Sequence, residues 1–459
     1  MPARFVNVDR NTPMFLPCDL REWVPGEHIV HFLLEAVEQI STEHFHINHH
    51  GTGSAQYPPA MMLALLIYCY CTGRTGSRTI EAATYSDVAV RFLCANLHPD
   101  HDSICTFRRE NKTAIEAAFV KVLQLAQELK LVRVGTISID GTKMLANASK
   151  HAAVSYGRAG EMIEQLQLEV KQLLEKAEGA DAQDTSSGLD VPAELARREK
   201  RLAALQEARR VIEERAREAA ASEQREHEAK MAERQAQREK GHKPKGKDPQ
   251  PPNSEPESKA QYNFTDSDSR IMKTGSGFQQ AYNAQAAVDE NMLIVGAQLS
   301  QAANDKEQLL PTLAAVVPEF KQEIKAVLVD SGFYSDSAVQ AIEQPSDGSG
   351  HGPIVYAAVA RQTHHHTVED LTKPEPAPLK DEATPKEQMA HRLASKTGRE
   401  LYKLRKQTVE PVFGIIKEAM GFRRFRLRGR DKVSLEWLLV CVSYNLKRIF
   451  ALKHLPRTA

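Results

Sequence analysis

The sequence lacks the features of a membrane, secreted or zinc-knuckle protein. Among its 459 residues, the longest apolar run, Ala60 to Tyr70, is well short of the roughly 20 residues that a membrane-spanning helix needs. The N-terminus lacks the apolar stretch of a signal peptide. The six cysteines form no CxxC pair, which argues against the usual zinc knuckle and favours thiols in a reducing cytosol. We therefore expect a cytoplasmic protein without membrane contact.

The sequence also lacks net charge, because 60 Lys and Arg residues balance 60 Asp and Glu residues. A zero sum alone would argue against a nucleic-acid partner, but a ligand responds to the local field. Residues 415–459 carry a net charge of +8, whereas residues 261–343 carry −6. The charges are therefore separated along the chain. With 41% hydrophobic residues, the composition is that of a folded protein, and the length predicts more than one domain.

Residues 1–130 are predicted to be helical. One helix is expected to begin at Ser77, and the polar stretch 96–100 should break it. A second short helix, capped by Asp102 or Ser103, carries two adjacent arginines. Two helices, a polar turn and a basic second helix are typical of a helix-turn-helix. We expect an all-α DNA-binding domain, with an ordinary helical bundle with a charged face as the alternative.

A β-rich part begins with a short strand over residues 134–140, which ends in Asp140 and is followed by a turn at residues 141–143. An aliphatic strand over residues 324–329 ends in Asp330. Other predicted elements are strands over 278–288, 293–299 and 353–359 and helices over 305–317, 386–409 and 434–450. This order predicts an α/β fold in which the two strands that end in aspartate could lie side by side.

Residues 157–240 have a different composition, rich in charged residues and alanine. Apolar residues recur there at helical spacing; they are Ile163, Leu166, Val170, Leu173, Leu195, Leu202, Leu205 and Ile212. We expect a long coiled-coil-like insertion, either an antiparallel helical hairpin or part of a coiled coil, followed by a disordered linker. The expected domains are residues 1–130, residues 131–150 with 261–450 (the α/β domain), the insertion and linker over 151–260, and a tail over 451–459.

Three acidic residues are candidate metal ligands. Asp140 and Asp330 each end a predicted strand, and Glu410 lies at the start of a further apolar helical segment. Two-metal phosphodiester chemistry needs two hard cations, about 3.5–4 Å apart, held by carboxylates. One ion activates the attacking water or 3′-hydroxyl, and the other stabilises the leaving oxygen. The three acids together would provide such a set.

At these positions the sequence resembles the DDE-type transposases of bacterial insertion sequences, whose catalytic domain is RNase H-like. The segments IDGTK around Asp140 and VLVDSGFYS around Asp330 resemble the regions of the two catalytic aspartates. The residues that resemble the family's Tyr–Arg–Glu–Lys signature are Tyr402, Arg405, Glu410 and Lys417. Arg405 and Glu410 are one residue further apart than the signature usually has them. The resemblance implies an RNase H-like mixed sheet with flanking helices.

The resemblance also implies a function. A transposase would bind the terminal inverted repeats, cleave the strands by two-metal hydrolysis and transfer the 3′-hydroxyl into target DNA. Asp140, Asp330 and Glu410 would bind two Mg²⁺ ions, with Mn²⁺ as a substitute. The DNA-binding residues would be Tyr402, Arg405, Lys417, Arg423, Arg424, Arg426, Arg108 and Arg109. The partner would be double-stranded DNA, from the transposon ends and the target, bound by a homodimer associated with the nucleoid.

Two other functions stay open. The protein could be a catalytically decayed DNA-binding or scaffold protein derived from a transposase, or an RNase H-like nuclease. The basic C-terminal segment favours a protein that acts at specific DNA sequences over a nuclease that degrades nucleic acid. Phe422 and Phe425 alternate with arginines there, which predicts a surface that grips phosphates and stacks on bases.

Overall fold

The computed structural model describes residues 19–48, 55–183, 191–239, 250–345, 351–359, 375–379 and 383–454. The chain divides into two compact units. The first consists of residues 1–146 and 281–459, and the second consists of residues 147–280. No helix in the described ranges is long and apolar enough to cross a membrane.

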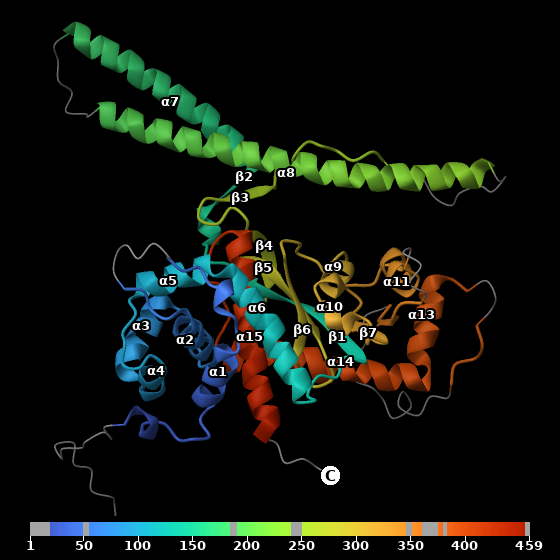
Figure 1. Ribbon diagram of the computed structural model, residues 1–459. Helices are drawn as coiled ribbons and strands as arrows, with labels where there is room; N and C mark the ends of the chain where they lie inside the picture. Colours follow the sequence, from blue (N-terminus) through green and yellow to red (C-terminus); the bar gives the residue numbers. More distant parts are fainter. Residues whose placement is uncertain are drawn as a thin grey trace, which may run out of the picture. The chain divides into compact units, whose positions relative to one another are not determined.

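The N-terminal part of the first unit is helical, as predicted (Figure 1). Its helices are α1 (Ile29–Glu38), α2 (Pro59–Cys71), α3 (Ser77–Ser86), α4 (Val88–Leu93), α5 (His101–Glu110) and α6 (Lys112–Glu128), with 3-10 turns η1 (Leu20–Glu22) and η2 (Thr42–His44). The longest apolar run of the sequence forms α2, which is buried along most of its length. The predicted caps of α5 are wrong, because Asp100 caps it by accepting a hydrogen bond from the Ser103 backbone amide (2.6 Å).

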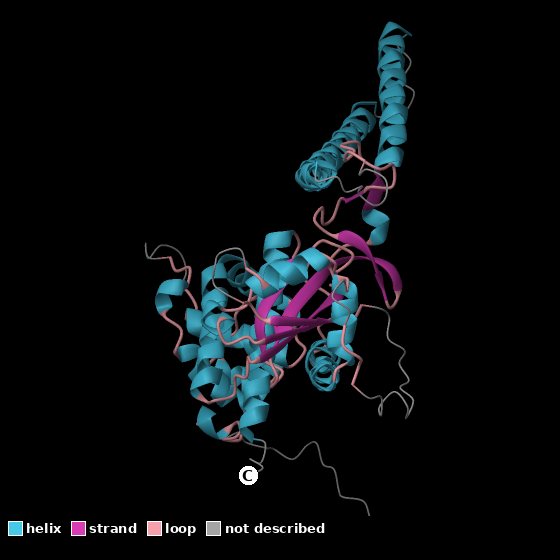
Figure 2. Cartoon of the chain, turned by 90° about the vertical axis from the view of Figure 1, so that its right-hand side faces the viewer, coloured by secondary structure: helices cyan, strands magenta, loops and turns pink. Residues whose placement is uncertain are grey.

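Figure 2 shows the strands of a mixed sheet in magenta, with helices beside them. The sheet has six strands in the order β4-β5-β1-β7-β8, with β6 also paired to β5. Its strands are β1 (Thr136–Leu145), β4 (Arg270–Thr274), β5 (Gly277–Val288), β6 (Ile294–Ser300), β7 (Ala326–Val329) and β8 (Ile354–Ala357). β5 is antiparallel to β1 and β6, whereas β1, β7 and β8 are parallel. Ser138 pairs with Leu328, so the strands of Asp140 and Asp330 are neighbours, as predicted.

The first strand is longer than predicted. We expected a turn at residues 141–143, but β1 continues to Leu145. The reason is its pairing with β5, which extends from Ser138 opposite Val288 to Leu145 opposite Ala281. Gly141, Thr142 and Lys143 have turn-like residue types, but the ladder of backbone hydrogen bonds outweighs that local preference. Asp140 therefore lies within a central strand.

The remaining elements of the first unit are α9 (Leu309–Ala314), α10 (Pro318–Lys321), α11 (Asp336–Glu343), α13 (Pro385–Ala394), α14 (Lys396–Gly414), the π-helical turn η4 (Ile415–Ala419) and α15 (Arg430–His454). The helix predicted over 386–409 is two helices, because Ser395 has an extended backbone and caps α14 through its side chain. The predicted tail over 451–459 is helical as far as His454, and its other residues lie outside the described part of the chain. The helix predicted over 305–317 is the shorter α9.

Helices cover the sheet through apolar side chains. Buried Ala326, Leu328 and Tyr356 of β7 and β8 pack with Leu393 and with α14 residues; those α14 residues are Leu401, Tyr402 and Leu404. This packing places α14 across the parallel half of the sheet. The helix can therefore bring polar side chains to the strand ends that carry the candidate acids.

A buried polar network links the N-terminal helices to α15. Glu436 of α15 is fully buried, and its carboxylate accepts hydrogen bonds from the Tyr70 hydroxyl (2.7 Å) and from the backbone amides of Arg426 (2.8 Å) and Leu427 (2.9 Å). The Arg108 guanidinium, 3% exposed, donates to the Tyr70 hydroxyl (2.9 Å) and lies 3.8 Å from the Glu436 carboxylate. A buried acid is tolerated here because each of its oxygens has donors.

We predict that Glu436→Ala lowers the free energy of unfolding by about 3–5 kcal/mol, because it leaves Arg108 buried without its counter-charge and two amides without an acceptor. Tyr70→Phe should cost less, about 1 kcal/mol, because it removes one hydroxyl. Equilibrium unfolding in urea measures both values. Equal losses for the two variants would contradict the role given to the carboxylate.

The second unit contains the expected helical hairpin. Its elements are η3 (Lys150–Ala152), β2 (Ala153–Ser155), α7 (Tyr156–Gln183), α8 (Val191–Glu239) and β3 (Gln261–Asn263), which pairs with β2. The Tyr156 hydroxyl at the start of α7 donates to Glu213 (2.8 Å), whereas Glu169 further along α7 pairs with Arg198 (3.0 Å). These contacts show that the two helices are antiparallel. Residues 240–249 of the predicted linker lie outside the described residues.

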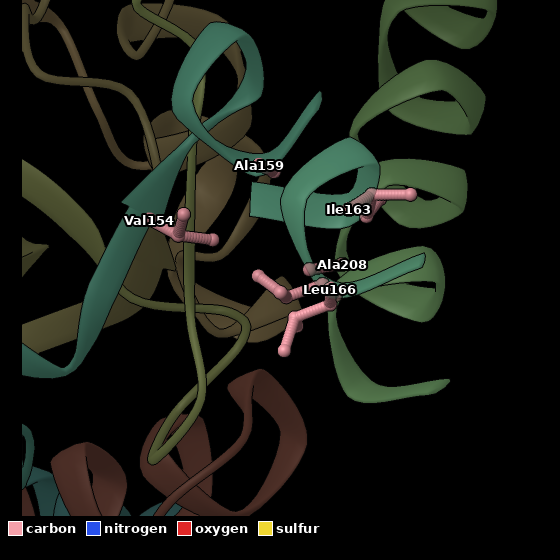
Figure 3. Packing of buried hydrophobic residues seen from close by; sticks show 6 residues of the cluster. Val154, Ala159, Ile163, Leu166 and Ala208 are labelled. Carbon is pink, nitrogen blue, oxygen red and sulfur yellow. The ribbon is translucent and has the colours of Figure 1, made fainter. Parts of the chain in front are cut away.

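A small apolar cluster joins the two helices at the base of the hairpin (Figure 3). Its buried residues are Val154, Ala159, Ile163, Leu166, Leu205 and Ala208. Ile163 and Leu166 come from α7 and Leu205 comes from α8, and all three are among the apolar residues predicted at helical spacing, whereas Ala208 of α8 was not predicted. Arg201, Glu207 and Arg210 of α8 are exposed, whereas Arg198, Arg209 and Arg215 are half-buried.

We predict that Leu205→Ala weakens the hairpin by about 2–4 kcal/mol, because it opens a cavity in this cluster. Leu205 is 2% exposed, whereas Leu168 on α7 is 58% exposed, so Leu168→Ala is the matched control and should change stability by less than about 0.5 kcal/mol. Amide hydrogen exchange in α7 and α8 measures both. If the amides of both variants exchanged at the wild-type rate, the apolar cluster would not be the contact that holds α7 against α8.

Candidate active site

The site is built on one face of β1. Side chains alternate along a strand, so Ser138, Asp140 and Thr142 point to the same face. Each of them binds a residue from α14 or from η4. The Thr408 hydroxyl donates to Ser138 (2.8 Å), and the Lys417 ammonium donates to Thr142. The helical segment is therefore held along the face that carries Asp140.

Asp140 is a largely buried carboxylate. One oxygen, Oδ1, accepts from the backbone amide of Gly141 (2.8 Å), and Oδ2 accepts from Arg405 Nη1 (3.2 Å). Burial raises the pKa of Asp140 to about 6, and the charge of Asp330 acts in the same direction. The Arg405 guanidinium opposes this shift. The charge of Asp140 at neutral pH therefore depends on Arg405.

Asp330 directly follows β7 and lies close enough to act electrostatically on Asp140, Arg405 and Tyr402. Its Oδ1 accepts from the Gly332 backbone amide (2.8 Å). The Tyr402 hydroxyl donates to the carbonyl of Val329, the residue before Asp330 (3.0 Å). Burial raises the pKa of Tyr402, so its hydroxyl keeps its proton at neutral pH. α14 thus reaches the end of β7 as well as β1.

Glu410 lies on α14, and its side chain is 46% exposed. Its Oε1 accepts from Arg405 Nη2 (3.0 Å), so one guanidinium binds both Asp140 and Glu410. The Arg405 side chain is 11% exposed, and its Nε is buried without a hydrogen-bond partner. Burial disfavours the charge of Arg405, but Asp140, Tyr402, Glu410 and Asp330 together outweigh that effect and raise the pKa of the guanidinium. Arg405 is therefore a fixed cation between two candidate ligands.

The donor set fits a hard divalent cation, although it is not preassembled. Among the residues that the structure describes, no group of three or more His, Cys, Asp or Glu side chains is arranged to hold a metal ion. The guanidinium of Arg405 lies between Asp140 and Glu410. Carboxylate oxygens are the ligands that Mg²⁺ and Mn²⁺ prefer, and these two carboxylates already share a cationic partner. The chemistry of the residues therefore suits a metal that would replace the guanidinium contacts.

Lys417 does not lie on the same α-helix as Glu410. α14 ends at Gly414, and Lys417 belongs to the π-helical turn η4. The turn directs the Lys417 ammonium to the Thr142 hydroxyl, on the same strand face as Asp140. Burial lowers the pKa of Lys417.

The arginine-rich segment lies beside the end of β1. The Leu145 amide donates to the Arg423 carbonyl (3.2 Å), and the Phe425 amide donates to the Leu145 carbonyl (2.9 Å). Arg423, Arg424 and Arg426 are exposed. The predicted base-stacking surface is wrong, because Phe422 and Phe425 are buried, with 1% and 0% exposure. The segment buries Phe422, Phe425 and Leu427 in the core and leaves the arginines between them in solvent.

Four of the arginines predicted to bind DNA already have protein partners. Arg423 forms an ion pair with Glu418 (2.5 Å), and Arg426 Nε donates to the Thr75 hydroxyl (3.1 Å). Arg108 donates to Tyr70 and to the Thr75 carbonyl (3.0 Å) inside the core, so its placement does not support the expected DNA contact. The adjacent Arg109 is exposed, with Nη2 donating to the Thr106 hydroxyl (3.1 Å). Of the two predicted helix arginines, Arg109 alone has a guanidinium on the surface.

Three polar residues of the site were not predicted: Ser138, Thr142 and Thr408. Ser138 and Thr142 flank Asp140 at two-residue spacing, and this period-two pattern of polar residues in a buried strand was the available signal. Thr408 carried no comparable signal. Its hydroxyl also donates to the Leu404 carbonyl (2.7 Å), a contact that any threonine in a helix can make.

We predict that Arg405→Met raises the pKa of Asp140 above about 6, because the positive charge that opposes the effect of burial is lost. Asp140 would then be mostly protonated at neutral pH. Carboxyl ¹³C NMR of aspartate-labelled protein measures the titration, with the spectrum of Asp140→Asn to assign the signal. An unchanged pKa in the variant would show that Arg405 does not neutralise this carboxylate.

Two segments of the chain match models of known protein families. Residues 374–450 match a family described as "Transposase DDE domain", and residues 18–110 match a family described as "Transposase domain (DUF772)". The first match includes Tyr402, Arg405, Glu410 and Lys417, whereas Asp140 and Asp330 lie outside both matches. No curated protein and no solved structure matches the chain. The chain is thus similar to transposase domains in its N-terminal helices and, as a DDE domain, in the helical region that carries Glu410.

Proposed function

We propose that this protein is a DDE transposase of an insertion sequence, which binds terminal inverted repeats, cleaves DNA strands and joins the 3′-hydroxyl to target DNA. One observation carries the proposal. α14, inside the segment similar to a DDE domain, connects Glu410 to Asp140 through Arg405 and reaches the residue before Asp330 through Tyr402. Three acids that are far apart in sequence therefore belong to one polar site.

The strand order supports the RNase H-like part of the proposal. β5 is antiparallel to both β1 and β6, and β7 and β8 extend the sheet in parallel with β1. Asp140 on β1 and Asp330 after β7 are thereby placed on adjacent parallel strands. In this proposal residues 131–150 and 261–450 form the catalytic domain, residues 1–130 bind DNA, and residues 151–260 are an insertion.

In the proposed reaction Asp140, Asp330 and Glu410 hold two Mg²⁺ ions, or Mn²⁺ in their place. When bound, such ions supply an activated oxygen nucleophile and stabilise the leaving oxygen. Asp140 is the most buried of the three acids, and the amide of Gly141 orients it by a hydrogen bond (2.8 Å). Arg405 opposes the effect of burial on the charge of Asp140 and, once displaced from the carboxylates, offers its planar fork to a phosphate.

DNA contact is assigned to the basic side chains around this site. Arg423, Arg424 and Arg426 are exposed on a segment that hydrogen-bonds to the end of β1, so phosphates bound there would lie close to the strand of Asp140. Lys417 and Tyr402 lie closer to the acids and would position the strand that is cut. Arg109 is the candidate in the N-terminal helices. Paired DNA ends imply a homodimer, and DNA binding implies a place at the nucleoid.

The decisive experiment is cleavage of a duplex that carries the DNA flanking the protein's own coding region, with Mg²⁺ and the full-length chain. The wild type should nick at defined ends, and Asp330→Ala should reduce the rate by at least about 100-fold, because a metal ligand is lost. Asp336→Ala is the matched control, since Asp336 is an exposed aspartate of the same region whose carboxylate accepts from the Tyr334 hydroxyl (2.5 Å). It should keep wild-type activity.

The outcomes separate the three candidate functions. End-specific nicking that survives Asp330→Ala would make the catalytic assignment wrong. Specific binding of the ends without any cleavage by the wild type would favour a decayed DNA-binding protein. Cleavage without preference for the ends would favour a plain nuclease.

A further inference from the structure

A buried polar cluster lies on the face of the sheet opposite Asp140. Gly141 and Lys143 alternate with Asp140 and Thr142 along β1, so they point to the other face. They pair with Gln285 and Asn283 of β5, whose side chains therefore share that face. Both amides are fully buried in a strand that otherwise consists mostly of small or apolar residues. Lys143, Asn283 and Gln285 have no place in the proposed reaction.

Asp305, in the loop before α9, is the centre of this cluster. Its Oδ1 accepts hydrogen bonds from Asn283 Nδ2 (2.6 Å), Gln285 Nε2 (2.7 Å) and Lys143 Nζ (3.3 Å). The Lys143 and Asp305 side chains are only 18% and 22% exposed. Three donors on one oxygen, two of them amides and one a cation, hold the carboxylate in a single orientation.

The cluster packs directly against the backbone beside Asp140. A Cβ atom at position 141 would lie 2.2 Å from Gln285 Nε2 and 2.7 Å from Asp305 Oδ1, both closer than atoms can approach. Glycine at position 141 therefore lets the two side chains touch the main chain of β1. The amide of the same Gly141 donates to Asp140 Oδ1 (2.8 Å). One peptide thus contacts the polar cluster on one face of the sheet and the candidate metal ligand on the other.

The cluster also lowers the stability of the folded protein. Asn283 Oδ1 and Gln285 Oε1 are buried without a hydrogen-bond partner, because the amide groups turn their NH₂ ends toward Asp305. Each unpaired buried acceptor costs about 1–3 kcal/mol, so an apolar filling would make a more stable sheet. Buried polar groups kept at such a cost are found where they orient a functional group.

We propose that Asp305 is a positioning residue for Asp140: together with Asn283, Gln285 and Lys143 it fixes the Gly141 peptide and thereby the direction of the Asp140 carboxylate. The proposal rests on the proposed function, since it concerns the geometry of a metal ligand. The negative charge of Asp305 behind β1 also raises the affinity of Asp140 for any cation, in agreement with its effect on the Asp140 pKa.

The test uses the full-length protein and Mn²⁺ alone, without DNA, in isothermal titration calorimetry. Asp305→Asn should weaken Mn²⁺ binding by about 10–100-fold, the usual cost of removing a partner behind a metal ligand. The Mg²⁺ concentration needed for half-maximal nicking should rise by a similar factor, while binding of the DNA ends in EDTA stays at the wild-type level. Glu307→Gln, an exposed acid two positions away in the same loop, is the matched control and should change neither quantity.

A second variant separates positioning from folding. Asp305→Asn leaves Lys143 without its counter-charge, so the double variant Lys143→Gln/Asp305→Asn, which removes both charges, is measured beside it. A folded double variant with weak Mn²⁺ binding supports the proposal. Wild-type Mn²⁺ binding in either folded variant overturns it, and so does failure of both variants to fold, since the cluster would then serve the fold alone.

Failure of this inference is distinguishable from failure of the proposed function. If Asp330→Ala abolishes end-specific nicking and Asp305→Asn leaves nicking and Mn²⁺ binding unchanged, only the role of Asp305 is wrong. If Asp330→Ala has no effect, the metal site itself is misassigned.

Discussion

The charge of Asp140 inside a central strand is the constraint on which the rest of the site depends. Burial favours the protonated acid and raises its pKa to about 6, so the carboxylate form needs compensation. Arg405 provides it from α14, and it binds Glu410 with its other terminal nitrogen. The contact that neutralises Asp140 is therefore also the contact that sets the position of α14. At this site the position of α14 and the charge of Asp140 therefore cannot be changed independently.

The same physical solution recurs where the N-terminal helices meet α15. There Glu436 is fully buried and surrounded by donors from Tyr70, Arg426 and Leu427. Both places bury an acid and neutralise it with an arginine, Arg405 in one and Arg108 in the other. Breaking either pair leaves an uncompensated charge in the interior, which costs far more than a surface ion pair. The segments that carry these residues are thereby tied to the sheet and to each other.

Structural elements that local sequence patterns encode were predicted correctly. Features that depend on contacts between segments far apart in the sequence were not. Aliphatic runs ending in an acid located β1 and β7 correctly as neighbours. The continuation of β1 beyond Gly141 depends on its pairing with β5, and no local sequence pattern predicts that pairing. Arg108 was taken for a surface residue, yet the Tyr70–Glu436 bond that surrounds it joins residues 366 positions apart. Composition and spacing predicted Asp140, Arg405 and Glu410 as site residues. They could not predict that Arg405 binds both acids, because those contacts depend on the fold and on the side-chain rotamers.

The place where the second unit leaves the sheet has an evolutionary consequence. Leu145 pairs with Ala281, so the chain departs from the end of β1 and returns on the neighbouring strand at the same level. For the sheet, most of residues 147–280 form the connection between β1 and the part of β5 that pairs with it, and this connection also carries the edge strand β4. The entropy of closing such a connection rises by only about 0.6 kcal/mol for each doubling of its length. Related proteins can therefore lengthen, shorten or exchange this connection, and acquire new partners through it, without moving the strand that carries Asp140.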